Sequence, residues 1–219
     1  MKHTNHLLAA AFCLAASATM SHAQTLRIGP AAGWLHSMPS GQESGDGLYA
    51  GVSGEVDFSG KRSGLFAGAS LLLEKRQWDS NGYLYAPGSG DQASVDTWHY
   101  TTYSLKIPLS VGYGVRLSGA ARLYAAAGPY LSIGIAGKEK VATYVPADGQ
   151  MLEKKVSGNV FADHIMNRVG WGIGAGAGAE LWSHYRVGIA YDHSMSDIFS
   201  GGHSDSRHRT LSVGVGYMF

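Results

Sequence analysis

The sequence is short of cysteine, proline and net charge, and each shortage excludes a class of protein. It contains one cysteine, Cys13, and 6 prolines in 219 residues. A single cysteine excludes a disulfide scaffold, and Cys13 lies in a segment that we expect to be removed from the mature protein. The low proline content argues against a low-complexity linker. The net charge of +1 provides no bulk attraction to a polyanion, so no nucleic-acid partner is expected.

The sequence also lacks an apolar run long enough to form a transmembrane helix. The stretch LLAAAFCLAASATM near the N-terminus is too short to span a bilayer, and it follows the positively charged Lys2. The small-residue motif SHA then ends at Ala23, as in a secretory signal peptide that is cleaved at this point. We therefore predict a signal peptide over residues 1–23 and one mature domain over residues 24–219, which leaves the cytoplasm.

Glycine, by contrast, is abundant, and it is set between regularly spaced apolar residues. The chain has 31 glycines, several of which occupy every second position of VGWGIGAGAGAEL at residues 169–181. Glycine at this density disfavours a helix. The apolar residues alternate in the same way over residues 99–117 and 210–219. A period of two over a dozen residues indicates β-strands.

Eight segments of the sequence follow this pattern and are predicted as strands. They are residues 25–37, 47–59, 63–78, 99–117, 121–138, 167–182, 185–197 and 207–219. Short connections at 60–63, 118–120 and 183–184 alternate with longer polar ones at 38–46, 79–98, 139–166 and 198–206. Such alternation is typical of outer-membrane barrels, which have short periplasmic turns and long extracellular loops. The sequence therefore predicts an all-β fold, an eight-stranded antiparallel up-and-down transmembrane β-barrel, with both ends of the mature chain in the periplasm.

Charged side chains on these strands fall on the face opposite the apolar one. A soluble sandwich or a lipocalin-like cup would turn such charges to water, whereas an outer-membrane barrel turns them into its lumen. An Arg or Lys facing lipid at mid-depth costs about 2–4 kcal/mol. We predict an internal network that closes the lumen and is formed by Arg27, Glu55, Asp57, Glu74, Arg76, Lys106, Arg116, Arg122, Arg168, Glu180, Arg186 and Asp192.

Aromatic residues on the apolar face favour the membrane alternative. Those at the predicted outer rim are Trp34, Tyr103, Trp171 and Tyr191. Those at the predicted periplasmic rim are Phe58, Tyr113, Tyr185, Tyr217 and Phe219. Two aromatic belts are expected of a membrane barrel, and a sandwich offers no reason for them. Outer-membrane lipids are therefore the expected surroundings of the wall.

The last ten residues, TLSVGVGYMF, form an alternating strand that ends on Phe219. In a barrel this strand pairs with the first one, so that no unpaired backbone edge faces lipid. The aromatic pair Tyr217 and Phe219 resembles the C-terminal sorting signal of outer-membrane proteins. The resemblance implies recognition by the barrel-assembly machinery during biogenesis.

Two strands carry a resemblance to a known family. YSLKIPLSVGYGV at 103–115 contains Ile-Pro-Leu, and LYAAAGPYLSIGIAGK at 123–138 runs through Tyr124 to a Gly-Pro-Tyr that ends at Tyr130. These strands resemble the outer-membrane β-barrel domain family that includes PorT-like proteins. The resemblance implies a barrel over the whole mature chain. PorT itself is implicated in protein secretion, so a secretion-associated role is one of the functions that it suggests.

Catalysis and metal binding have weak support in the residues. YDHSMSD at 191–197 offers His193 and Ser194, but the lipid A deacylase pattern has its serine two positions after the histidine, where Met195 stands. GGHSDSRHR at 201–209 contains histidines and an aspartate without a recognised metal-ligand spacing. We predict a non-enzymatic protein with no cofactor and no metal.

The long connections are the remaining functional surface. Residues 79–98 and 139–166 are long enough to extend the hairpins or to bind something outside the cell. We expect a structural or surface-interaction role, with an extracellular ligand or secretion partner that no motif identifies. A small-solute channel and a lipid-modifying enzyme are the alternatives.

Overall fold

The computed structural model describes residues 25–59, 63–84, 94–145, 150–152, 159–162, 164–200 and 206–219. The expected signal peptide, with its cleavage site and Cys13, lies outside the described residues. In the described part of the chain, no helix is long and apolar enough to cross a membrane.

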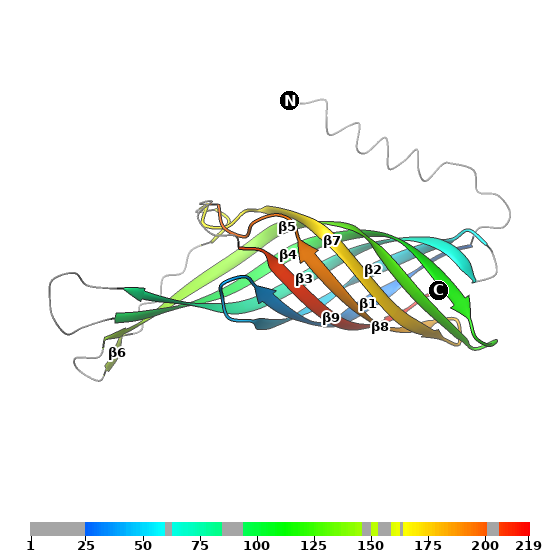
Figure 1. Cartoon of the computed structure of the whole chain (residues 1–219), viewed down its shortest axis with the longest axis horizontal. Helices are drawn as coiled ribbons and strands as arrows, with labels where there is room; N and C mark the ends of the chain where they lie inside the picture. The colour runs from blue at the N-terminus through cyan, green and yellow to red at the C-terminus, as the bar shows by residue number, and fades with distance from the viewer. Residues whose placement is uncertain are drawn as a thin grey trace, which may run out of the picture.

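The described chain forms nine antiparallel strands, eight of which close into a ring. They are β1 (Thr25–Pro39), β2 (Gly45–Asp57), β3 (Gly64–Leu84), β4 (Ser94–Arg116), β5 (Ala121–Val145), β6 (Gln150–Leu152), β7 (Val169–Leu181), β8 (Tyr185–Ser194) and β9 (His208–Tyr217). The three-residue β6 pairs only with the far end of β5, and β5 pairs with β7 inside the ring. The pairing of β1 with β9 closes the cylinder, which lies horizontally in Figure 1. The predicted eight-stranded up-and-down barrel is confirmed.

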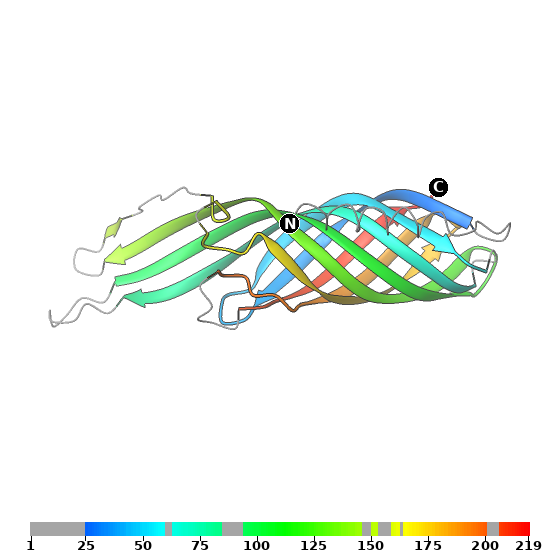
Figure 2. The same ribbon diagram turned by 90° about the horizontal axis from the view of Figure 1, so that it is seen from above.

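Three strands run well beyond the ring, so the predicted boundaries of the long loops were wrong. Residues 79–98 were expected to form a connection, but the β3–β4 ladder continues from Asp79↔His99 to Leu84↔Ser94. The β4–β5 ladder likewise reaches Val95↔Tyr144. Figures 1 and 2 show this projection of β3, β4 and β5 at the left end of the barrel. A sheet that leaves the bilayer needs no apolar face, so its sequence does not alternate and its strands escape a search for periodicity.

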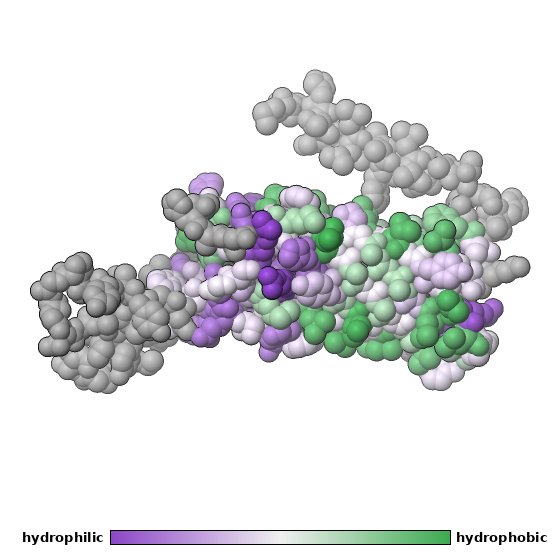
Figure 3. Space-filling view, viewed as in Figure 1, coloured by the Kyte–Doolittle hydropathy of each residue, from purple (hydrophilic) through white to green (hydrophobic). Residues whose placement is uncertain are grey.

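The outer face of the ring is apolar, as predicted for a membrane barrel. Trp34, Trp171 and Tyr191 are exposed on it, as are Tyr113 and Tyr185 toward the other end. Apolar side chains gather over the barrel wall in Figure 3, while hydrophilic ones lie toward the projection. Burying this face in lipid removes the cost of exposing it to water, about 25 cal/mol per Å² of apolar surface. A soluble barrel would bury this face, so the lipocalin-like alternative is wrong.

The seam between the first and last strands is closed to the end of the chain. The Phe219 amide donates a hydrogen bond to the Ile28 carbonyl at 3.0 Å, and Met218 is 1% exposed. Gly29 lies at this seam, where a Cβ atom would come within 1.7 Å of the Tyr217 carbonyl oxygen. Only a residue without a side chain fits such a close approach of two backbones.

Replacing Gly29 should therefore prevent closure of the barrel. We expect Gly29→Val to lose the heat-dependent shift in gel migration that folded membrane barrels show in cold SDS, because the new Cβ strikes backbone that cannot move aside. Gly54→Val is the matched control, since a Cβ at Gly54 meets its nearest atoms at 3.7 and 3.8 Å. A normal heat shift for both variants would show that the seam is not this tight.

Candidate functional site

Five charged side chains form one ion-pair cluster near the end of the barrel that carries the chain's C-terminus. We call it the lower cluster, and its members are Arg27, Glu55, Arg122, Glu180 and Arg186. Glu55 accepts hydrogen bonds from all three arginines, at 2.7 Å from Arg27, 2.9 Å from Arg122 and 2.7 Å from Arg186. Glu180 faces the same arginines at 2.7, 3.5 and 2.9 Å.

The lower cluster ties together strands that are far apart around the ring. Its members come from β1, β2, β5, β7 and β8. Three arginines against two glutamates leave a formal charge of +1 in a region where Glu55 and Glu180 are at most 2% exposed. Two arginines also lie over aromatic rings, Arg122 over Phe66 at 4.9 Å and Arg186 over Tyr124 at 5.1 Å. The electron-rich faces of those rings offset part of the excess positive charge.

A second cluster, the upper cluster, lies nearer the projection and consists of Glu74, Arg76, Lys106 and Asp192. Arg76 donates to Glu74 at 2.6 Å, and the Lys106 ammonium lies between Asp192 and Glu74, 3.5 Å from the latter. Lys106 also lies over the Tyr130 ring at 4.7 Å. Two acids and two bases balance here, so the upper cluster is formally neutral.

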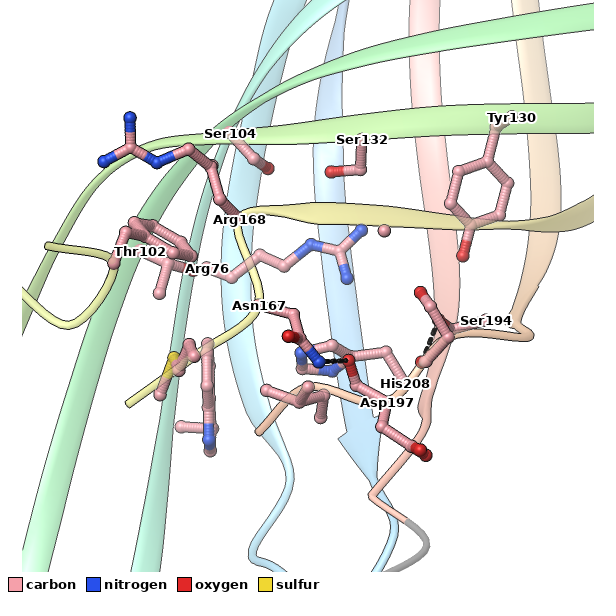
Figure 4. A pocket seen from close by; sticks show the side chains of 17 residues that line it. Arg76, Thr102, Ser104, Tyr130, Ser132, Asn167, Arg168, Ser194, Asp197 and His208 are labelled. Atoms are coloured by element: carbon pink, nitrogen blue, oxygen red, sulfur yellow. Dashed lines mark hydrogen bonds between the residues drawn. The ribbon is translucent and has the colours of Figure 1, made fainter. Parts of the chain in front are cut away.

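Three of the twelve predicted lumen charges do not join these clusters. Asp57 is buried, but its Oδ1 caps the turn after β2 by accepting hydrogen bonds from the Ser59 amide and hydroxyl at 2.9 and 2.7 Å. Arg116, at the end of β4, and Arg168, just before β7, are exposed. In Figure 4 the Arg168 guanidinium points away from that of Arg76. All three lie at or next to strand ends, and there the side chains of Arg116 and Arg168 reach solvent.

A cavity of about 270 Å³ separates the two clusters. Its lining includes the hydroxyl-bearing side chains of Tyr49, Tyr124, Ser53 and Ser110. The inward tyrosines fit because the opposing positions are glycine. A Cβ at Gly214 would lie 1.8 Å from the Tyr49 hydroxyl.

Beyond the upper cluster, an apolar cap covers the mouth of the barrel. It consists of Trp78, Tyr100, Val160, Phe161, Met166 and Ile198. Phe161 packs against β5, where a Cβ at Gly134 would come within 2.4 Å of its ring. The Val160 amide donates to the Gly137 carbonyl at 3.2 Å. The space of about 80 Å³ beneath the cap is shown in Figure 4.

The cap was missed by sequence reasoning, which assigned residues 139–166 and 198–206 to polar loops. Two signals for it exist in the sequence. Val160 and Phe161 are adjacent apolar residues in a polar stretch, and the facing positions on β5 are glycines. Neither signal is specific, because the contact between a loop and a strand that is distant in sequence depends on the tertiary structure.

His208 supports the cap from below. Its ring lies edge-on to Trp78 at 5.0 Å, and its Nδ1 is 3.0 Å from the Ser37 hydroxyl. Burial, together with the nearby positive charge of Arg76, lowers the pKa of His208 well below its ordinary value. The imidazole is therefore neutral where it packs against the cap.

The structure does not assemble the weaker candidates for catalysis and metal binding. Ser194 is buried in the lumen and donates to the Ser196 carbonyl at 2.8 Å, whereas the next residue toward the N-terminus, His193, points to the other side of the wall. They therefore do not form a nucleophile–base pair. Among the described residues, no three His, Cys, Asp or Glu side chains could hold a metal ion. His203 and Asp205 lie outside the described residues.

The predicted C-terminal signal lies at the closed end of the seam. Phe219 is 72% exposed, and its ring packs edge-on against Tyr217 at 5.0 Å. Tyr217 in turn stacks on His184 at 5.2 Å. The pair is accessible at the barrel rim, where Trp182 adds an exposed aromatic ring that the sequence prediction had not included.

Comparison with known proteins identifies a family that spans nearly the whole chain. A family model described as outer membrane protein beta-barrel domain matches residues 6–219. The match is to the general domain and does not separate PorT-like proteins from other members. No curated protein matches the chain.

Several solved structures are similar to the chain at low sequence identity. The attachment invasion locus protein Ail of Yersinia pestis, in complex with the heparin analogue sucrose octasulfate, is 12% identical, with 89% of this chain and 99% of that chain covered and a TM-score of 0.36. Neisserial surface protein A is 14% identical, with 90% and 99% covered and a TM-score of 0.43. OprG of Pseudomonas aeruginosa is 11% identical, with 90% and 95% covered and a TM-score of 0.32.

Neutralising one glutamate of the lower cluster should destabilise the barrel strongly. Glu55→Gln leaves three arginines, two of them buried, with one carboxylate, and we expect the free energy of unfolding to fall by about 3 kcal/mol. Urea unfolding in lipid vesicles, followed by tryptophan fluorescence, measures this change. The control Arg116→Gln removes an exposed charge and should change stability by at most about 0.5 kcal/mol. Equal effects would show that the cluster does not hold the barrel together.

The cap should loosen as the pH falls. When the cap opens, His208 regains its ordinary pKa of about 6.5 and can bind a proton, whereas it stays neutral while the cap is closed. The free energy that keeps the cap closed is therefore fully present above about pH 6.5 and decreases as the pH falls below it. We expect amide exchange at Val160 and Met166, corrected for the intrinsic rate, to accelerate between pH 8 and pH 5. His208→Asn should remove this dependence on pH. Acceleration that persists in His208→Asn would assign it to another group.

Proposed function

Because the chain belongs to the outer membrane protein β-barrel domain family, we propose that it is a non-conducting barrel of the cell outer membrane that displays the β3–β4–β5 projection at the cell surface. The projection is the interaction surface in this proposal, and the barrel is its anchor. The observation that carries the proposal is the filling of the lumen at three successive levels. The lower cluster, the upper cluster and the apolar cap each cross the interior.

The proposed orientation rests on the lengths of the connections. Three connections are short at the end that carries Phe219, namely residues 58–63, 117–120 and 182–184. The strands β3, β4 and β5 extend from the opposite end. Outer-membrane barrels place short turns in the periplasm and long loops outside. Both ends of the mature chain are therefore periplasmic in this proposal, and a secretion partner or an extracellular ligand would meet the projection.

The internal cavity favours a small-solute channel as the second candidate. A path through the barrel would use the space of about 270 Å³ between the clusters. A solute would have to separate the ion pair of Lys106 with Asp192 above that space and those of Arg186 with Glu55 and Glu180 below it. Separating buried ion pairs costs several kcal/mol, so a closed barrel is the better-supported proposal.

The mature chain is predicted to be free of cysteine, which permits a direct test of closure and orientation. We expect no stable conductance steps from the refolded protein in planar bilayers. Lys140→Cys, on the projection, should react with a membrane-impermeant maleimide in intact cells. Gly119→Cys, in a short turn with no atom within 4 Å of its Cβ, should react only after the outer membrane is opened. Reproducible conductance steps would contradict closure, and labelling of Gly119→Cys in intact cells would reverse the orientation.

Trimming the projection separates a surface-interaction role from a purely structural one. A variant that joins Asp79 to His99 through a short turn keeps the wall of the ring, and its heat shift in a gel verifies folding. In a deletion strain, this variant should fail to restore the phenotype that the full chain restores. Full restoration by the trimmed variant would leave the barrel itself as the functional part.

A further inference from the structure

Lys75 faces outward from the described wall at the level of the outer aromatic belt. Lys75 is in register with Leu48 on β2 and Tyr103 on β4, and Leu48 is in register with Trp34 on β1. The charged neighbours of Lys75 on β3, Glu74 and Arg76, point into the lumen. Lys75 is half-buried, and none of the described residues forms an ion pair with it. A lysine that faces outward at the membrane interface without an ion-pair partner on the chain is stabilised by an anion from the surrounding membrane.

Lys75 lies at the upper end of an apolar groove in the lipid-facing wall. Ala32 and Ala50 are directly paired and form its floor, because their side chains are the smallest in their rows. Val215 lies next to Ala32 on one side, and Leu73 lies next to Ala50 on the other. Leu48 and Lys75 lie at its upper end. A shallow apolar depression that opens to lipid fits part of an acyl chain.

Further positive charges lie above the groove on the same face of the sheet. Thr101 follows the row of Lys75 and Tyr103, and Lys138 is opposite it on β5. Lys140 is opposite His99 in the next row. Both lysines are exposed, and among the described residues neither has an ion-pair partner. Two carboxylates share this face, namely Asp79, 2.7 Å from the His99 ring, and Asp46, 2.8 Å from the His36 ring and two residues from Leu48 on β2. Lys75, Lys138 and Lys140 outnumber these two carboxylates, so the face keeps an excess of positive charge where the lipid headgroups lie.

We propose that this surface is a binding site for one phosphorylated glycolipid of the outer leaflet, of the lipid A type. An acyl chain lies over Ala32 and Ala50, and a phosphate accepts hydrogen bonds from Lys75, with Lys138 within reach of the same headgroup. The proposal deepens the proposed function and rests on its orientation, because only that orientation places the groove in the outer leaflet. Charge complementarity selects the phosphorylated lipid, since a neutral lipid would fill the groove but leave Lys75 unpaired.

The test counts bound lipid on the full mature chain in phosphatidylcholine nanodiscs. Diphosphorylated lipid A is the probe, and native mass spectrometry reports its stoichiometry and affinity. We expect one tightly held lipid A, with binding weakened about fivefold in Lys75→Gln, as loss of one cation near a lipid phosphate predicts. Ala50→Leu fills the groove without changing charge and should weaken binding as well. Arg116→Gln removes an exposed cation at the other end and should bind like the original chain.

Several outcomes would overturn the proposal. Unchanged affinity in both Lys75→Gln and Ala50→Leu, with a normal heat shift, would show that lipid A does not use this groove. Equal binding of dephosphorylated lipid A would remove the role of the lysines. If phosphatidylglycerol bound as tightly as lipid A, the site would bind any lipid with a phosphate and would not be specific for phosphorylated glycolipids. Each of these failures leaves the closed barrel and its projection intact, whereas surface labelling of Gly119→Cys would overturn the orientation and this inference together.

Discussion

The structure depends on one constraint, which is that no backbone hydrogen-bonding group can face hydrocarbon unpaired. A strand in lipid has no water to bind, so a sheet must close on itself. The chain satisfies this constraint by pairing β9 with β1 as far as the Phe219 amide. The absence of a side chain at Gly29 is a direct consequence, because the two backbones meet there most closely.

Closure with eight strands then determines what the interior can contain. A ring of this size has a lumen only wide enough for side chains, so every inward charge must find its partner across a short distance. The lower cluster meets that demand by connecting five strands through two glutamates. The same narrowness explains why inward tyrosines face glycines. The ion pairing of inward charges and the placing of inward tyrosines opposite glycines therefore both follow from the narrow lumen.

The constraint applies only within the lipid, and the closed ring gives way to an open sheet where the lipid ends. Beyond the Trp34 and Tyr103 level, β3, β4 and β5 no longer need to belong to a closed ring, and they continue as an open projection. The segments that do not project fold back over the mouth, and Phe161 covers the glycines of β5. At the boundary itself, the outward-facing Lys75 lies where a long side chain can reach from apolar surface to headgroup. The surfaces proposed for function are thus at or beyond the membrane interface.

The alternation of side chains was enough to predict which face of each strand meets lipid, because its period of two holds whatever the partner strand is. It therefore predicted the fold class, the strand number, the aromatic residues at the rims and the inward direction of most charges. Which charges meet depends on how distant strands are placed around the ring. Alternation says that Glu55 and Glu74 both point inward, but not that one lies among three arginines and the other beside Lys106. The same local pattern left Arg116 and Arg168 outside both clusters, since their side chains reach solvent at or next to strand ends. The cap and the projection also escaped prediction, because contacts between distant segments, and sheets outside lipid, impose no periodic pattern on the chain.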